Sequence, residues 1–278
     1  MKNFRPVTAG NRSSITQNFR TRLALSTALA TIAFGYAGRV AYAGSCVVGV
    51  PGTYLCSGFA NPGTDVTQTL SPGAPLTVTT DSTFSIDTST SGGNALTLTG
   101  TGGVSFTTSN NFSQITGASR GIYASNNGSG ALSITASAYG TVTGTSFDGI
   151  RARNNADTTD LTISARNVNG GIGGIYANNL GTGITSVTAS DFGQVTATSS
   201  FSTGITARNS AAATGDMTVS AGNVTGDSNG IYARNDGSGA LSVTASSFGQ
   251  VTGTNSTGIR ANNGVAGTDI TVSAGNVT

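Results

Sequence analysis

The residues that could support catalysis are few and of one kind. The chain contains no His and no Glu, and all eleven acidic residues are Asp. Three of them, Asp160, Asp216 and Asp269, occupy equivalent places in a repeated pattern, and glycoside hydrolysis requires a pair of carboxyl groups. Without His, a Ser-His-Asp triad and any His-containing metal site are excluded. We therefore expect no catalytic, cofactor-binding or metal-binding residue, with polysaccharide cleavage as the enzymatic alternative.

The first 43 residues have the pattern of an export signal. Residues 1–22 carry five positive charges, an apolar run follows over 23–38, and the letters AYA precede Gly44. Small residues at the first and third positions before a cut suit signal peptidase, so we predict cleavage between Ala43 and Gly44. A transmembrane anchor is the alternative, but the apolar run is short of the roughly 20 residues that span a bilayer.

Two cysteines, Cys46 and Cys56, follow the predicted cut. Export would place them in an oxidising compartment, where a disulfide is the default. Two thiols without His make a poor zinc site. We expect a disulfide that staples the N-terminal edge of the folded body.

A repeat dominates the rest of the chain. Its segments start 28, 25, 30, 26 and 28 residues apart, with Gly first, Ile second, Ala fourth and Asn sixth. The segments begin at Gly121, Gly149, Gly174, Gly204, Gly230 and Gly258. Each repeat has two further runs in which apolar residues alternate with Ser and Thr, which predicts strands with one buried face. Alternate repeats carry an aromatic–Gly pair, such as Phe192-Gly193 and Phe248-Gly249, so two repeat types alternate.

Three short strands and three turns per repeat predict one coil of a right-handed parallel β-helix for every 25–30 residues. Stacking at about 4.8 Å per coil would place the repeated Ile residues in one internal column and the Ala residues in another. Asp160, Asp216 and Asp269 would then lie about 9.6 Å apart, which is marginal for an inverting pair and too far for a shared metal.

The sixth residue of every repeat is Asn, at the end of a predicted strand. Asn tolerates a left-handed backbone, and stacked Asn amides can bond to one another as a ladder. The alternative is that these residues bind a ligand or carry glycan, and we favour the ladder. The members are Asn126, Asn154, Asn179, Asn209, Asn235 and Asn263.

The third residue lies between the buried Ile and Ala, so it should face outward. The row consists of Tyr123, Arg151, Tyr176, Thr206, Tyr232 and Arg260. Tyr and Arg are enriched at binding hot spots, which makes this row a candidate binding face. The alternative, which we favour, is a solvated face on which Tyr and Arg stack.

Four segments are expected: an extended signal peptide (1–43), a disulfide-containing segment (44–65), irregular first coils and a cap (66–120), and six repeats (121–278). The last repeat stops in mid-pattern, which indicates truncation. Outside the leader, seven Arg oppose eleven Asp, a net charge of −4. Such a body lacks the concentrated basic residues that nucleic acid requires, so we expect no nucleic-acid partner.

The basic leader ending in AYA, the early pair Cys46 and Cys56, and repeats such as residues 230–253 together resemble the passenger region of bacterial autotransporters (type V secretion). The resemblance covers essentially the whole chain. It implies a β-helix stalk secreted or displayed at the outer membrane of a Gram-negative bacterium, served by export machinery and followed by a transmembrane β-barrel. Nothing in this sequence resembles that barrel, so we expect either a fragment of a longer, full-length chain or a protein that depends on another route.

The function expected from these patterns is a non-catalytic stalk or adhesin that contacts a host cell surface, matrix or glycan. Besides polysaccharide cleavage, a self-assembling surface or fibre protein is the other alternative.

Overall fold

The computed structural model describes residues 44–109 and 113–278. The predicted signal peptide, with Ala43 of the predicted cleavage site, lies outside the described residues. Residues 41–278 form one compact unit, and its described part is built from strands and turns. Within that part, no helix is long and apolar enough to cross a membrane.

The strands belong to two sheets, which we call sheet A and sheet B. Sheet A has twelve strands and sheet B has eight. Sheet A contains β1 (Ser45–Val48), β2 (Thr53–Ser57), β4 (Leu76–Thr80), β5 (Ile86–Thr88), β7 (Val104–Thr107), β8 (Gln114–Gly117), β10 (Leu132–Gly144), β12 (Leu161–Gly170), β14 (Thr185–Ala197), β16 (Met217–Gly226), β18 (Leu241–Gly253) and β20 (Ile270–Val277). Sheet B contains β3 (Gln68–Leu70), β6 (Leu96–Gly100), β9 (Ile122–Asn126), β11 (Asp148–Asn154), β13 (Gly173–Asn179), β15 (Thr203–Asn209), β17 (Asn229–Asn235) and β19 (Thr257–Asn263).

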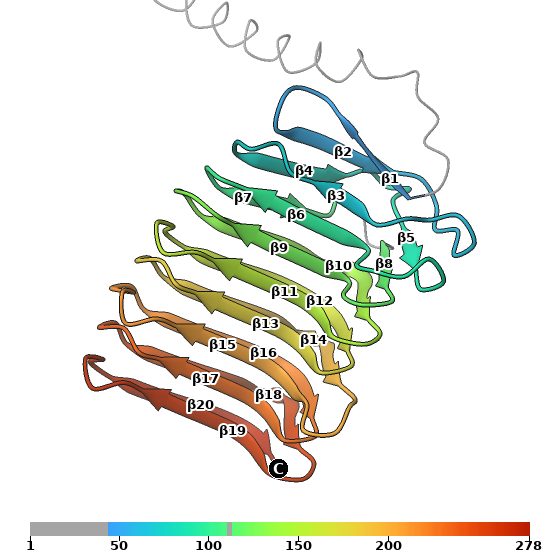
Figure 1. The fold of residues 1–278 in the computed structure, drawn as a ribbon. Coiled ribbons are helices and arrows are strands. Elements are labelled where there is room, and N and C mark those ends of the chain that lie inside the picture. Colours follow the sequence, from blue (N-terminus) through green and yellow to red (C-terminus); the bar gives the residue numbers. More distant parts are fainter. Residues whose placement is uncertain (1–43, 110–112) are drawn as a thin grey trace, which may run out of the picture. The chain divides into compact units, whose positions relative to one another are not determined.

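The chain alternates between the sheets, and each strand after β1 pairs in parallel with its equivalent one coil away (Figure 1). Sheet B therefore runs from β3 to β19 through every coil, and its eight strands mark eight stacked turns of a β-solenoid. The predicted all-β, parallel, coiled architecture is confirmed.

Three separate strands per coil, as predicted, occur only in the first coils. There β7 and β8 are distinct, and both pair with β10, which runs through the corner as one strand. From β10 onward the second and third predicted strands are merged, with a register shift at the corner. The aromatic–Gly pair thus lies within a bent strand and does not separate two strands.

The core consists of the predicted columns. Strand pairing places Ile150 opposite both Ile122 and Ile175, and the Ile column continues in register to Ile231 and Ile259. All its members up to Ile231 are fully buried, and burial of an Ile side chain contributes about 2–3 kcal/mol. Because one coil cannot cover its own apolar face, each coil depends on its neighbours.

The Gly that opens each repeat is required by a Val column on the opposite side of the core. A Cβ built on Gly204 would lie 2.4 Å from Cγ1 of Val224, and one on Gly174 would lie 2.4 Å from Cγ1 of Val195. Real Cβ atoms do not approach so closely, so only Gly lets sheet B pass this near to sheet A.

Residues 66–120 are more regular than the sequence indicates, because β3 and β6 extend sheet B and β4 and β7 extend sheet A in register. The first coil is covered instead by the antiparallel hairpin β1–β2, whose second strand pairs with β4. The Cys46–Cys56 disulfide joins directly opposed residues of this hairpin, as predicted. Asp65 fixes the same edge by accepting the backbone N–H groups of Gly44, Asn61 and Asp87.

Candidate functional site

The predicted outer row forms one continuous column on sheet B. Strand pairing places Tyr123 beside Arg151, Arg151 beside Tyr176, and Thr206 between Tyr176 and Tyr232. Arg260 follows Tyr232 on the next coil. The Tyr side chains are half-buried along the sheet, so their rings lie against neighbours in the column.

Guanidinium groups stack on these rings, as the solvated-face interpretation predicts. Cζ of Arg151 lies 4.5 Å from the centre of the Tyr176 ring. Tyr232 has a guanidinium on each side, with Arg208 at 5.2 Å and Arg260 at 5.4 Å. These contacts hold the rings in fixed positions and place cations over their faces.

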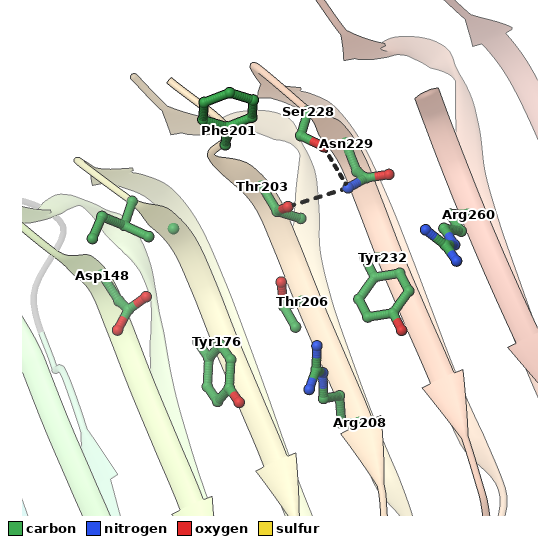
Figure 2. Close-up of a pocket in the computed structure, with 12 residues that line it drawn as sticks. Asp148, Tyr176, Phe201, Thr203, Thr206, Arg208, Ser228, Asn229, Tyr232 and Arg260 are labelled. Carbon is green, nitrogen blue, oxygen red and sulfur yellow. Dashed lines mark hydrogen bonds between the residues drawn. The ribbon is translucent and has the colours of Figure 1, made fainter. Parts of the chain in front are cut away.

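Thr206 interrupts the column and leaves a groove of about 370 Å³. Its short, buried side chain lies on the floor between Tyr176 and Tyr232, and Arg208 extends along the same strand (Figure 2). At one end Asn229 Nδ2 donates to Ser228 Oγ at 3.1 Å and to Thr203 Oγ1 at 3.4 Å. The groove therefore combines aromatic faces, cations, hydroxyls and an amide.

Phe201 stands at the rim of this groove and was not predicted. Its ring is 89% exposed, and it is the one non-glycine residue of the described segments with a positive φ, at 62°. The backbone N–H of Phe201 donates to Oδ2 of Asp227 at 2.7 Å, which fixes the strained conformation. Backbone strain of this kind concentrates at binding sites. The signal in the sequence was the 30-residue interval between Gly174 and Gly204, the longest of the series.

A second column of Arg residues runs beside the first on the outer face. Pairing aligns Arg153 with Asn178, Asn178 with Arg208, and Arg208 with Arg234. The outer face of sheet B is therefore basic, although the body carries a net negative charge.

Two carboxylates neutralise part of this basic face. Asp148 is buried and lies 3.2 Å from Arg120 Nε and 3.4 Å from Arg151 Nη1. Asp236 lies 2.9 Å from Arg234 Nε, and its hydrogen bond, followed by its charge, raises the pKa of Arg234. Among the described residues, no carboxylate forms an ion pair with Arg208 or Arg260, so both cations remain available to a ligand.

The Asn column is in register, but its amides mainly close turns. Asn179 Nδ2 donates to the carbonyls of Gly183 and Ile184, and its Oδ1 accepts the N–H of Gly181. Within the described segments the predicted ladder is present at one step, where Asn235 Nδ2 donates to Asn263 Oδ1 at 2.9 Å. The expectation of a left-handed backbone at these Asn residues is wrong. Among the non-glycine residues of the described segments, Phe201 alone has a positive φ.

The other Asn side chains of this column also act within their own coil. The Nδ2 atoms of Asn126 and Asn154 each donate to a backbone carbonyl of the turn that follows. Nδ2 of Asn263 donates to the carbonyl of Asp269 at 2.8 Å. Asn209 differs, because its Oδ1 accepts the Thr185 hydroxyl.

The predicted Asp column is also used structurally. Asp160 Oδ1 accepts the N–H of Ile184 at 2.9 Å, and Asp216 Oδ1 accepts that of Ala240 at 2.8 Å. Each carboxylate thereby links one coil to the next. Across residues 44–109 and 113–278, no group of three potential metal ligands is assembled.

These features define a parallel β-solenoid with an aromatic, basic outer face and a groove in that face. Comparison with models of protein families, with curated proteins and with solved structures gave no significant match.

Proposed function

We propose that the protein is an exported, non-catalytic β-solenoid of the autotransporter-passenger kind that acts at the Gram-negative cell surface as a stalk and adhesin. The observation that carries the adhesive role is the groove over Thr206, where Tyr176 and Tyr232 flank a small floor. Two guanidinium groups, which form no ion pair within the described segments, adjoin it. A stalk without a binding role would not require this interruption of the column.

The groove suits acidic saccharides of a cell surface or matrix. A guanidinium group presents a planar set of donors that matches a carboxylate or sulfate. The Tyr176 ring, covered by Arg151 on one side, offers its other face to the C–H groups of a sugar, and Ser228 and Asn229 can bond to hydroxyls. Because the Arg208 and Arg260 side chains already lie against Tyr232, little side-chain freedom is lost on binding.

Export is supported by two independent features. The leader has the charge, apolar run and small residues of a signal sequence. The Cys46–Cys56 disulfide in the structure suits an oxidising compartment. The N-terminal sequence of protein collected from the cell surface should therefore begin at Gly44, and retention of residues 1–43 would contradict the predicted cleavage.

The adhesive role is tested by binding of the purified protein to a sulfated polysaccharide and to a polyuronate. We expect salt-sensitive binding that Arg208→Gln with Arg260→Gln weakens by tenfold or more. Replacement of Tyr123, Tyr176 and Tyr232 by Ala together should abolish it. Arg234→Gln is the matched control, because this cation lies on the same face but pairs with Asp236.

Binding that survives the loss of both groove cations would contradict the assignment. An equal loss in the Arg234→Gln variant would also contradict it, because nonspecific charge attraction would then account for the affinity. If neither acidic polysaccharide binds, the adhesive role proposed for this groove is wrong.

A further inference from the structure

A second surface, on sheet A, carries a different set of side chains. Phe192 of β14 and Phe248 of β18 are 82% and 87% exposed at the corner of their coils. The two residues occupy the same place two coils apart, so their backbones are separated by about 9.6 Å. Scattered exposed apolar residues are ordinary, but the same exposed ring recurring in register is a surface feature.

The corner protrudes at alternate coils because the chain is longer there. Ala189 pairs with Ala221 and Gln194 pairs with Asn223. On β14, residues 190–193 lie between Ala189 and Gln194. On β16, only Gly222 lies between the two partner residues. A Cβ on Gly222 would lie 2.7 Å from Cα of Asp191, so β16 passes close beneath the protruding corner.

A groove of about 470 Å³ lies beside the Phe192 protrusion and crosses the coils as far as Gln250, two residues beyond Phe248; the Phe248 ring lies outside its lining. Its lining includes Phe192 and, on successive coils, the outward side chains of Gln194, Asn223 and Gln250. Thr225 and Thr252 supply hydroxyls beside them. No charged residue lines this groove.

The floor is fixed by hydrogen bonds between coils. Asn223 Oδ1 accepts the backbone N–H of Gln250 at 3.1 Å, and Asn167 Oδ1 accepts that of Gln194 at 3.2 Å. The Asn amides are thereby held in place before any ligand arrives, which lowers the entropy lost on binding. The side chains of Gln194 and Gln250 are exposed and lie beside these Asn residues in the groove.

We infer that this corner groove is a binding site for a neutral oligosaccharide, separate from the Tyr/Arg face. The amides and hydroxyls donate and accept hydrogen bonds, as sugar hydroxyls require. The Phe192 ring provides a flat apolar platform for the C–H face of a pyranose ring, and Phe248 stands beyond the far end of the groove. An acidic ligand would find no cation in the lining, and an apolar peptide would cover the exposed Gln side chains without pairing their amides.

The repeat of the corner also indicates the shape of the ligand. The groove crosses the coils from Asn167 to Gln250, and the exposed Phe248 lies about 9.6 Å beyond Phe192, an arrangement that matches an extended chain. The groove therefore selects a linear oligosaccharide rather than a single sugar.

The test is calorimetric titration of the full-length protein with neutral, linear hexasaccharides of glucose, N-acetylglucosamine, mannose and galactose. We expect at least one of them to bind. Phe192→Ala with Phe248→Ala should weaken that binding about a hundredfold, or about tenfold per ring. Both rings lie in solvent, so the thermal midpoint should not change. Phe59→Ala is the matched control, because Phe59 is similarly exposed (73%) outside the groove.

The double variant Arg208→Gln with Arg260→Gln should bind the neutral hexasaccharide normally. This result would separate the corner groove from the groove over Thr206. The inference is overturned if no hexasaccharide binds, if binding survives loss of both phenyl rings, or if Phe59→Ala weakens it equally. Asn223→Ala should also lower the affinity, and unchanged affinity would contradict the role given to the amide row.

Discussion

Replacement of Asn179 by Ala tests the turn-closing role of the Asn column most directly. Asn179 is fully buried, and its side chain makes hydrogen bonds to three backbone groups of the following turn. Its neighbour Asn178 has the same side chain but points outward on sheet B. The two single substitutions therefore compare the same chemical change at a buried and at a solvent-facing position.

The expected cost follows from the partners that lose their bonds. Alanine leaves the N–H of Gly181 and the carbonyl of Gly183 short of a partner, and each buried unsatisfied group costs about 1–3 kcal/mol. The carbonyl of Ile184 retains the N–H of Leu161 at 2.9 Å, so its loss adds little. We expect Asn179→Ala to lower the free energy of unfolding by about 2–4 kcal/mol, and Asn178→Ala by less than about 0.5 kcal/mol.

The Asn179→Asp variant separates the donor from the acceptor. It keeps an oxygen for the N–H of Gly181 but directs a second oxygen at two carbonyls, so it should be at least as destabilising as Ala. Urea unfolding followed by circular dichroism measures the free energy of unfolding of the three variants. Equal m-values are required for the comparison. Amide exchange over residues 181–184 should rise in the Asn179 variants alone. Equal stability of the Asn178→Ala and Asn179→Ala variants would refute the turn-closing role.

Two further predictions concern the corner and the N-terminal cap. Gly222→Ala places a Cβ 2.7 Å from both Cα and the carbonyl oxygen of Asp191, so we expect a loss of about 1–3 kcal/mol. Thermal unfolding measures this loss, with Ser220→Ala as the control. Equal unfolding midpoints of the two variants would contradict the close packing at Gly222. Cys46→Ser should lower stability by about 2–3 kcal/mol, because the disulfide closes a short loop over the first coil. Reductant should lower the midpoint of the wild-type chain but not of this variant, and an unchanged wild-type midpoint would contradict the stapling role.

The interior of the solenoid could be predicted from the sequence because it depends on patterns within and between neighbouring repeats. Alternation of apolar and hydroxyl residues determines which side chain faces inward, and the repeat interval determines which residues stack. The Ile column and the outward Tyr/Arg row follow from these two facts alone. The merging of two strands at the corner could not be predicted, because Phe192-Gly193 has the composition of a turn.

The candidate grooves could not be predicted, because both depend on differences between neighbouring coils. Thr206 is unremarkable in its own repeat and opens a space only between Tyr176 and Tyr232. Gly222 likewise marks a groove only because the neighbouring coils are longer at that corner. The hydrogen-bond partners of the Asn column were also inaccessible, because they depend on how far each loop returns toward its own strand.

The distribution of charge follows from what each side chain can do at a turn. A carboxylate accepts hydrogen bonds, so Asp can satisfy backbone N–H groups where a strand ends, as Asp160, Asp216 and Asp227 do. Arg only donates and cannot take this role, and Arg151, Arg208 and Arg260 lie on the outer face of sheet B. The turn aspartates are committed to backbone groups, whereas Arg208 and Arg260 remain exposed beside the Thr206 groove. An acidic saccharide can therefore approach this face although the net charge of the body is −4.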